Sequence, residues 1–150
     1  MKRADDVRCV AGILVGGRSA RMGRPKATLP LPDGRWLVEH VAGVTRQTGR
    51  WIDEIVIVGQ CEGLPASLAD ARRLADAEPG AGPLAGLCSL LEYAGLRWSL
   101  LLACDMPLLE PKLLERLCMA ASPKYDAVAF RLTDQPKSWH ACCAFYHPRL

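Results

Sequence analysis

The chain has 150 residues, of which 50% are hydrophobic and 23% are charged, and its formal net charge is +3. This length and composition predict one globular domain with a single hydrophobic core. The small net charge and the scattered tryptophans do not favour nucleic acid as a partner. Asp5 and Asp6 stand where a signal peptide would be apolar, and no apolar stretch has membrane-spanning length. We therefore expect a cytoplasmic protein that binds neither nucleic acid nor membrane.

Short apolar runs alternate along the chain with segments of helical periodicity. In chain order, the pattern predicts a strand at 9–15, a helix at 36–47, a strand at 54–58, a short helix at 64–71, a short strand at 72–75, a helix at 83–93, a strand at 98–103, a helix at 111–121, and strands at 125–131 and 140–146. Such alternation indicates an α/β fold with a mostly parallel sheet and helices on both faces. The polar loop at 132–138 permits a hairpin-like reversal, so we expect one antiparallel strand. No internal repeat or linker divides the chain, which indicates a single domain over 1–150.

The first predicted strand runs directly into a glycine-rich basic loop. Its residues are Leu14, Val15, Gly16 and Gly17, followed by Ser19, Arg21, Gly23 and Lys26. Glycines let the backbone approach a ligand and point N–H groups at an anion, and flexible cations reach phosphate oxygens. The spacing matches neither the P-loop nor Gly-x-Gly-x-x-Gly. The loop predicts a site for nucleotide phosphates, and the alternative is an ordinary turn with a solvated basic cluster.

A carboxylate follows a second buried strand. Asp105 comes just after the strand at 98–103, and Pro107 restrains Met106 to extended geometry, which stiffens the loop. A carboxylate in this position suits Mg²⁺, which typically binds one or two carboxylates together with phosphates and water. The alternative is a cap for the helix at 111–121, but Asp105 lies too far upstream to cap it directly.

Two further segments are weaker candidates. Asp76 follows the short strand at 72–75, where an aspartate is commonly a turn former. The segment from Gly80 to Gly86 leads into the helix at 83–93. Its free N–H groups and the small Gly82 could accommodate a flat ring, or the segment could be a plain loop with tight helix packing at Gly86.

The loop pattern Gly-Gly-x-Ser-x-Arg-Met-Gly-x-x-Lys resembles the signature loop of the molybdenum cofactor nucleotidyltransferases. Taken with the two aspartates and the second glycine segment, nearly the whole chain resembles the molybdenum cofactor guanylyltransferase family. The resemblance implies a three-layer, Rossmann-like nucleotidyltransferase fold. It also implies transfer of GMP from GTP to the terminal phosphate of molybdopterin, or of molybdenum-molybdopterin, with release of pyrophosphate and Mg²⁺ as cofactor. Other proteins of cofactor biosynthesis are implied as further partners.

The resemblance also implies roles for individual residues. Arg21, Lys26 and Asp105 would be catalytic, the first two on the phosphates and Asp105 on the metal. Nucleotide contacts would come from these three residues and from Leu14, Val15, Gly16, Gly17, Ser19, Gly23, Asp76, Gly82, Pro83, Leu84 and Gly86. The last five of these would lie near the guanosine.

Some positions leave the nucleotide and the reaction open. Pro25 stands where the guanylyl family often has Asp, and proline there also occurs in the related cytidylyltransferases, whereas Gly16-Gly17 is typical of the guanylyl loop. Gly59-Gln60 stands where many relatives carry an asparagine that meets the nucleotide. Relatives continue past the position of Leu150, so we expect the nucleotide-binding part of a longer protein. One alternative is a cytidylyltransferase that acts on the same cofactor or on another phosphorylated acceptor, and a second is a nucleotide-binding module without catalysis.

The seven cysteines and three histidines show no metal-ligand spacing. The cysteines are odd in number and most lie in apolar runs, which predicts that they act as small buried hydrophobic residues in a reducing compartment. Cys104 adjoins Asp105 and is the one cysteine expected beside the site. For His40, His140 and His147 we expect structural roles.

Overall fold

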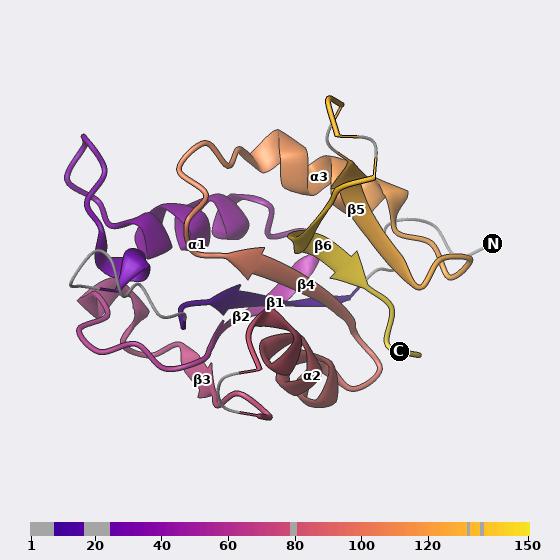
Figure 1. Cartoon of the computed structure of the whole chain (residues 1–150), viewed down its shortest axis with the longest axis horizontal. Coiled ribbons are helices and arrows are strands. Elements are labelled where there is room, and N and C mark those ends of the chain that lie inside the picture. The colour runs from indigo at the N-terminus through magenta and orange to yellow at the C-terminus, as the bar shows by residue number, and fades with distance from the viewer. Residues whose placement is uncertain (1–7, 17–24, 79–80, 132, 136) are drawn as a thin grey trace.

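The computed structural model describes residues 8–16, 25–78, 81–131, 133–135 and 137–150. They form a six-stranded sheet in the order β3-β2-β1-β4-β6-β5, with three α-helices (Figure 1). The strands are β1 (Cys9–Leu14), β2 (Ile52–Val58), β3 (Arg72–Leu74), β4 (Trp98–Ala103), β5 (Ala127–Arg131) and β6 (Trp139–Tyr146). The helices are α1 (Leu37–Gln47), α2 (Pro83–Ala94) and α3 (Pro111–Ala120), with 3-10 turns η2 (Lys26–Thr28) and η3 (Ala66–Leu68).

Strands β3, β2, β1 and β4 run parallel, and β6 pairs antiparallel with both β4 and β5. Helices α1 and α3 cover one face of the sheet and α2 covers the other, which makes three layers (Figure 1). This confirms the predicted α/β fold with a mostly parallel sheet and one antiparallel strand. Among the described residues, no helix is long and apolar enough to cross a membrane.

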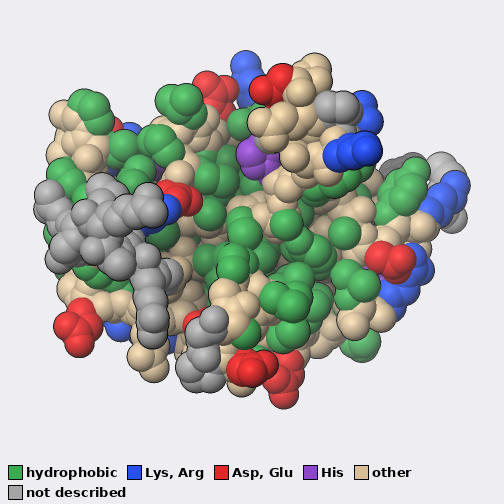
Figure 2. All heavy atoms as spheres, viewed as in Figure 1, with side chains coloured by type: hydrophobic (Ala, Val, Ile, Leu, Met, Phe, Trp, Pro, Cys, Tyr) green, Lys and Arg blue, Asp and Glu red, His purple; other side chains and the backbone are tan. Residues whose placement is uncertain are grey.

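The core is split by the sheet because alternate residues of a strand point to opposite faces. On β1, Ala11 and Ile13 are buried in the larger cluster with α1 and α3, whereas Val10 is buried in the smaller cluster with Leu90 of α2. A strand buried on both faces reads as a continuous apolar run, which is why β1 and β4 were predictable. Figure 2 shows hydrophobic side chains gathered over the centre of one face of the molecule, with charged groups mostly around its edge.

The segment expected to be a helix at 64–71 forms only the single 3-10 turn η3. In the stretch from Ala66 to Asp70, Leu68 alone is buried, so no apolar face stabilises a longer helix. Other boundaries move by one to two residues: β2 begins at Ile52, β5 begins at Ala127, and α1 begins at Leu37. The backbone N–H of Trp36 precedes α1 and donates to the Glu39 carboxylate, with a distance of 3.0 Å.

Two glycines allow a matched test of the packing between the helices and the sheet. A Cβ at Gly12 would lie 2.7 Å and 2.9 Å from the two methyl carbons of Leu90, which is fully buried, so atoms of the packed core would have to shift. We expect Gly12→Ala to lower the free energy of unfolding by about 1–3 kcal/mol through overpacking. Gly43, inside α1, has nothing within 4 Å of a Cβ, so Gly43→Ala should raise it by about 0.5–1 kcal/mol. Urea unfolding measures both changes, and a Gly12→Ala protein as stable as the wild type would contradict the described packing of α2 on β1.

Candidate functional site

Four parallel strands end in one row across the sheet. Leu14, the last residue of β1, is paired with Val58 of β2 and with Ala103 of β4, and Val58 is paired with Leu74 of β3. The pairing continues one step into the loops, where Cys104 N–H donates to the Leu14 carbonyl at 3.1 Å. The segments that follow these strands therefore leave the sheet at the same edge. In open α/β sheets, this edge is where ligands bind.

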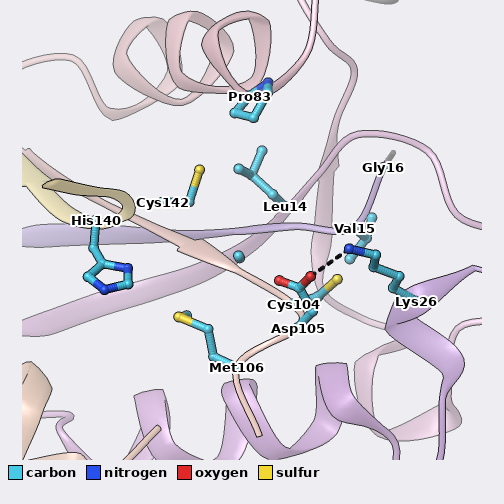
Figure 3. Close-up of a pocket in the computed structure, with 11 residues that line it drawn as sticks. Leu14, Val15, Gly16, Lys26, Pro83, Cys104, Asp105, Met106, His140 and Cys142 are labelled. Carbon is cyan, nitrogen blue, oxygen red and sulfur yellow. Dashed lines mark hydrogen bonds and ion pairs between the residues drawn. The ribbon is translucent and has the colours of Figure 1, made fainter. Parts of the chain in front are cut away.

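A pocket of about 520 Å³ opens at this edge (Figure 3). Its lining residues are Leu14, Val15, Gly16, Lys26, Pro83, Ala103, Cys104, Asp105, Met106, His140 and Cys142. They come from the ends of β1 and β4 and the loops that follow them, from η2, from the first turn of α2 and from the start of β6. Six of the predicted site residues are thus brought together in one hollow, namely Leu14, Val15, Gly16, Lys26, Pro83 and Asp105.

Lys26 and Asp105 form an ion pair in the wall of this pocket. The Nζ of Lys26 donates to Oδ2 of Asp105 at 2.9 Å, although 79 residues separate them in the chain. The hydrogen bond and the charge of Asp105 raise the pKa of Lys26 above its ordinary value, so the lysine is a stable cation. The side chains of Lys26 and Asp105 remain 51% and 41% exposed. Both charged groups are therefore open to a ligand from solution.

A second part of the site forms where Gly16 meets the loop after β2. Gly59 has φ +92°, and a Cβ there would lie 3.2 Å from the backbone nitrogen of Gly16. Glycine is needed at this position because the backbone is left-handed and the two loops nearly touch. Asp76 is half-buried beside this contact, with Oδ1 3.6 Å from a Cβ placed on Gly59. The structure thus places Asp76 beside Gly59, the glycine that meets Gly16, and not among the lining residues of the pocket.

The glycines of the segment that leads into α2 are required for different reasons. Gly82 caps the helix with φ +71°, a conformation that favours glycine, and Pro83 follows at the first helical position. At Gly86, a Cβ would lie 2.4 Å from Cδ2 of Leu14, so this glycine lets α2 pack closely on β1. Leu84 is 67% exposed. Of this segment, Pro83 lines the pocket, whereas Gly82, Leu84 and Gly86 are not among its lining residues.

Four predicted positions, Gly17, Ser19, Arg21 and Gly23, lie outside the described residues, as does Gly80. Their assigned roles remain predictions. They follow Gly16 and precede Lys26 in the chain, and both of these residues line the pocket.

The structure adds Met106, His140 and Cys142 to the pocket, which the sequence had not indicated. The expected structural role does not hold for His140, which is exposed and lines the hollow. His140 and Cys142 both lie near the start of β6, but their side chains point in opposite directions (Figure 3): Cys142 packs toward the α2 cluster, whereas His140 lies on the side of α3. Because β6 is antiparallel, its start lies at the edge where the parallel strands end. The reversal expected at 132–138 is the signal that could have placed the start of β6 at this edge.

The other two histidines contact core residues. A ring nitrogen of His40 lies 3.1 Å from the carbonyl oxygen of Leu109, and the ring of His147 packs edge-on against Trp98. The cysteines are free thiols. Burial raises the pKa of Cys104 to about 12, so its thiol is neutral at ordinary pH and unsuited to act as a nucleophile. Within the described part of the chain, no group of three His, Cys, Asp or Glu residues could hold a metal ion by itself.

Comparison with known proteins gives one consistent family. The model of the MobA-like NTP transferase domain matches residues 11–150. The probable molybdenum cofactor guanylyltransferase of Mycobacterium avium is 40% identical over 124 residues, which are 79% of this chain and 60% of that protein. The protein of the same description from Mycobacterium tuberculosis is 41% identical over 122 residues, which are 78% and 58% of the two chains. This chain therefore spans about three fifths of the curated relatives it matches.

Solved structures show the same fold. Molybdopterin-guanine dinucleotide biosynthesis protein A from Archaeoglobus fulgidus superposes with a TM-score of 0.68 at 25% identity, covering 93% of this chain and 68% of that one. The 2-C-methyl-D-erythritol 4-phosphate cytidylyltransferase from Thermus thermophilus superposes with a TM-score of 0.61 at 19% identity, covering 95% and 72%. With residues 11–150 matched and the strand ends gathered on one pocket, the chain belongs to the MobA-like NTP transferase domain family.

Proposed function

We propose that this chain binds GTP at the pocket and transfers GMP to the terminal phosphate of molybdopterin, or of molybdenum-molybdopterin, with release of pyrophosphate. The observation that carries this proposal is the ion pair of Lys26 with Asp105 in the wall of one pocket at the strand ends. A lysine suits a polyphosphate, and a carboxylate suits a hard cation. The guanylyl branch is favoured because the curated relatives at 40–41% identity are described as guanylyltransferases.

The residues of the chain act by position and charge. Gly16 leaves its backbone open at the pocket, so a phosphate can approach it closely. Lys26 would exchange the carboxylate of Asp105 for phosphate oxygens, since both partners are exposed. Arg21 would add a second cation from the same loop. These contacts would hold the triphosphate and favour the charge that gathers on the leaving group.

The reaction requires no strong base. An oxygen of the acceptor's phosphate monoester, already an anion, forms a bond to the α-phosphorus of GTP. The bond from that phosphorus to the oxygen that bridges it to the β-phosphate breaks, and its electron pair leaves with pyrophosphate. No proton needs to move, which fits a pocket whose cysteine at 104 is a neutral thiol and whose charged groups are a lysine and a carboxylate.

The donor set fits Mg²⁺ as the cofactor. Asp105 contributes one exposed carboxylate, and no further acidic residue lines the pocket in the described part of the chain. Mg²⁺ commonly uses one or two carboxylates and completes its octahedron with substrate phosphates and water. When bound, it would neutralise charge on the phosphate oxygens. Partner proteins of cofactor biosynthesis and a cytoplasmic location remain predictions from the sequence.

The nucleotide preference can be tested by thermal unfolding. With Mg²⁺ present, GTP should raise the melting temperature more than CTP or ATP at equal concentration. A ligand at a hundredfold excess over its Kd stabilises the native state by about 2.7 kcal/mol. Lys26→Met should reduce the GTP shift, whereas Lys112→Met removes an exposed lysine of α3 outside the pocket and should leave it unchanged. An equal or larger shift with CTP would move the assignment to the cytidylyl branch.

The role of Asp105 can be tested by Asp105→Asn, which keeps the size of the side chain and removes its charge. GTP binding in metal-free buffer should survive or tighten slightly, because a carboxylate that repels phosphate is lost. Pyrophosphate release should fall by about a hundredfold or more, equivalent to about 3 kcal/mol of transition-state stabilisation. Calorimetry with GTP and a pyrophosphate assay measure the two effects.

Two controls separate catalysis from folding. Exposed ion pairs contribute about 0–1 kcal/mol, so Asp105→Asn should unfold at nearly the same urea concentration as the wild type. Glu92→Gln removes an exposed carboxylate of α2 outside the pocket and should keep full turnover. Normal Mg²⁺-dependent turnover by the Asp105→Asn protein would rule out the metal role, and the cation would then be sought near Asp76.

A further inference from the structure

A second hollow adjoins the nucleotide pocket. Its volume is about 460 Å³, and we call it the side pocket. It is formed by the loop between β4 and α3, the first turn of α3, the end of β5 and the start of β6. Two residues, Met106 and His140, line both hollows. The two hollows therefore meet at Met106 and His140.

The walls of the side pocket suit an organic molecule better than a bare ion. Leu109, Leu113 and Phe130 supply an apolar surface, and Leu109 is buried. Thr133, Asp134 and Arg131 are exposed lining residues, and they supply a hydroxyl, a carboxylate and a guanidinium group. Apolar walls with a few polar groups are typical of small-molecule sites. A ligand with a flat apolar face and N–H groups at its edge would match this lining.

Another hollow of similar size does not have this connection. It has a volume of about 470 Å³ and is lined by residues that include Thr45, Ile52 and Asp70. It shares no lining residue with the nucleotide pocket, and Ile52 is the first residue of β2. A molecule there would sit near the opposite edge of the sheet. Of these two hollows, only the side pocket could present a substrate to the nucleotide.

The arrangement of the charged and polar groups fits an in-line displacement. In such a reaction, the attacking and leaving oxygens lie on opposite sides of the phosphorus. In Figure 3, Lys26 lies on one side of Asp105, whereas His140 and Met106 lie on the other. If Lys26 holds the leaving end of the triphosphate, the attacking phosphate must come from the side of His140.

We propose that the side pocket holds the body of the phosphorylated acceptor and that His140 binds the acceptor's phosphate at the junction of the two hollows. The proposal rests on the proposed nucleotidyl transfer and names the acceptor's place in it. An imidazole always has at least one N–H that can donate to a phosphate oxygen. His140 is exposed at the start of β6, so its ring is available to a ligand. The acceptor class is a phosphate monoester on a partly apolar body.

A small probe can test this site by NMR of the chain labelled with ¹⁵N. Mg²⁺ and α,β-methylene-GTP, which cannot react, first occupy the nucleotide pocket. Phenyl phosphate is then titrated, with phenol and inorganic phosphate as separate arms. We expect phenyl phosphate to shift amide signals of 106–113 and 130–143, and to bind more tightly than either of the other two probes, because it alone has both an aromatic body and a phosphate.

Three variants make the test specific. His140→Ala should weaken the binding of phenyl phosphate at least fivefold and leave the binding of phenol unchanged. Thr133→Trp, which places a large side chain in the lining of the side pocket, should weaken both. Lys137→Ala removes an exposed cation from the loop between β5 and β6, outside both hollows. This change should alter the affinity for phenyl phosphate less than twofold. An effect of Lys137→Ala as large as that of His140→Ala would show general charge attraction and overturn the proposal.

The outcomes separate this proposal from the proposed function. Failure of the protein to bind Mg²⁺ and the GTP analogue would contradict nucleotidyl transfer itself. If the analogue binds, the acceptor proposal is overturned by any of three results: no binding of phenyl phosphate, signals that shift only around Leu14 and Lys26, or unchanged affinity in His140→Ala. Localised shifts that depend on His140 while the analogue is bound would support it.

Discussion

The register of the sheet is the constraint on which the site depends. Leu14 pairs with Val58 and Ala103, so the loops after β1, β2 and β4 begin at one level. A slip of one residue would turn every side chain of a strand to the other face, and the core would lose its apolar contacts. The register is held by strands buried on both sides, such as β1, where Val10 and Ala11 lie in different clusters. Core packing thereby sets the level at which Val15, Gly59 and Cys104 leave the sheet.

The Lys26–Asp105 pair is positioned by this frame and adds little to it. Both side chains are half exposed, and exposed pairs contribute little to the free energy of folding. Each charge lowers the electrostatic cost of holding the other at the pocket, and each is free to exchange its partner for a ligand group. A phosphate and a divalent cation would replace the pair without leaving an unmatched charge. The pair is thus better understood as two ligand-binding groups that neutralise each other in the absence of ligand than as an interaction that stabilises the fold.

The sequence predicted those parts of the fold and site that depend on local pattern. Asp105 and Gly16 could be found because each directly follows an apolar run, and a buried parallel strand is such a run. His140 could not be found in this way, because its place depends on the partner of β6 and not on its neighbours in the chain. The close packing of Gly86 on Leu14 is likewise a contact between distant residues. The prediction of a helix at 64–71 was wrong because a single buried leucine does not stabilise a helix.

The antiparallel strand explains how this sheet can surround a reacting group. A parallel strand brings only its last residues to the ligand edge, and its chain then leaves into a helix. Strand β6 runs the other way, so its first residues, among them His140, stand at that edge beside the end of β4. Lys26 from η2 and His140 from β6 consequently approach Asp105 from different sides (Figure 3). One reversed strand would thus provide the second side that the proposed in-line transfer between two phosphates requires.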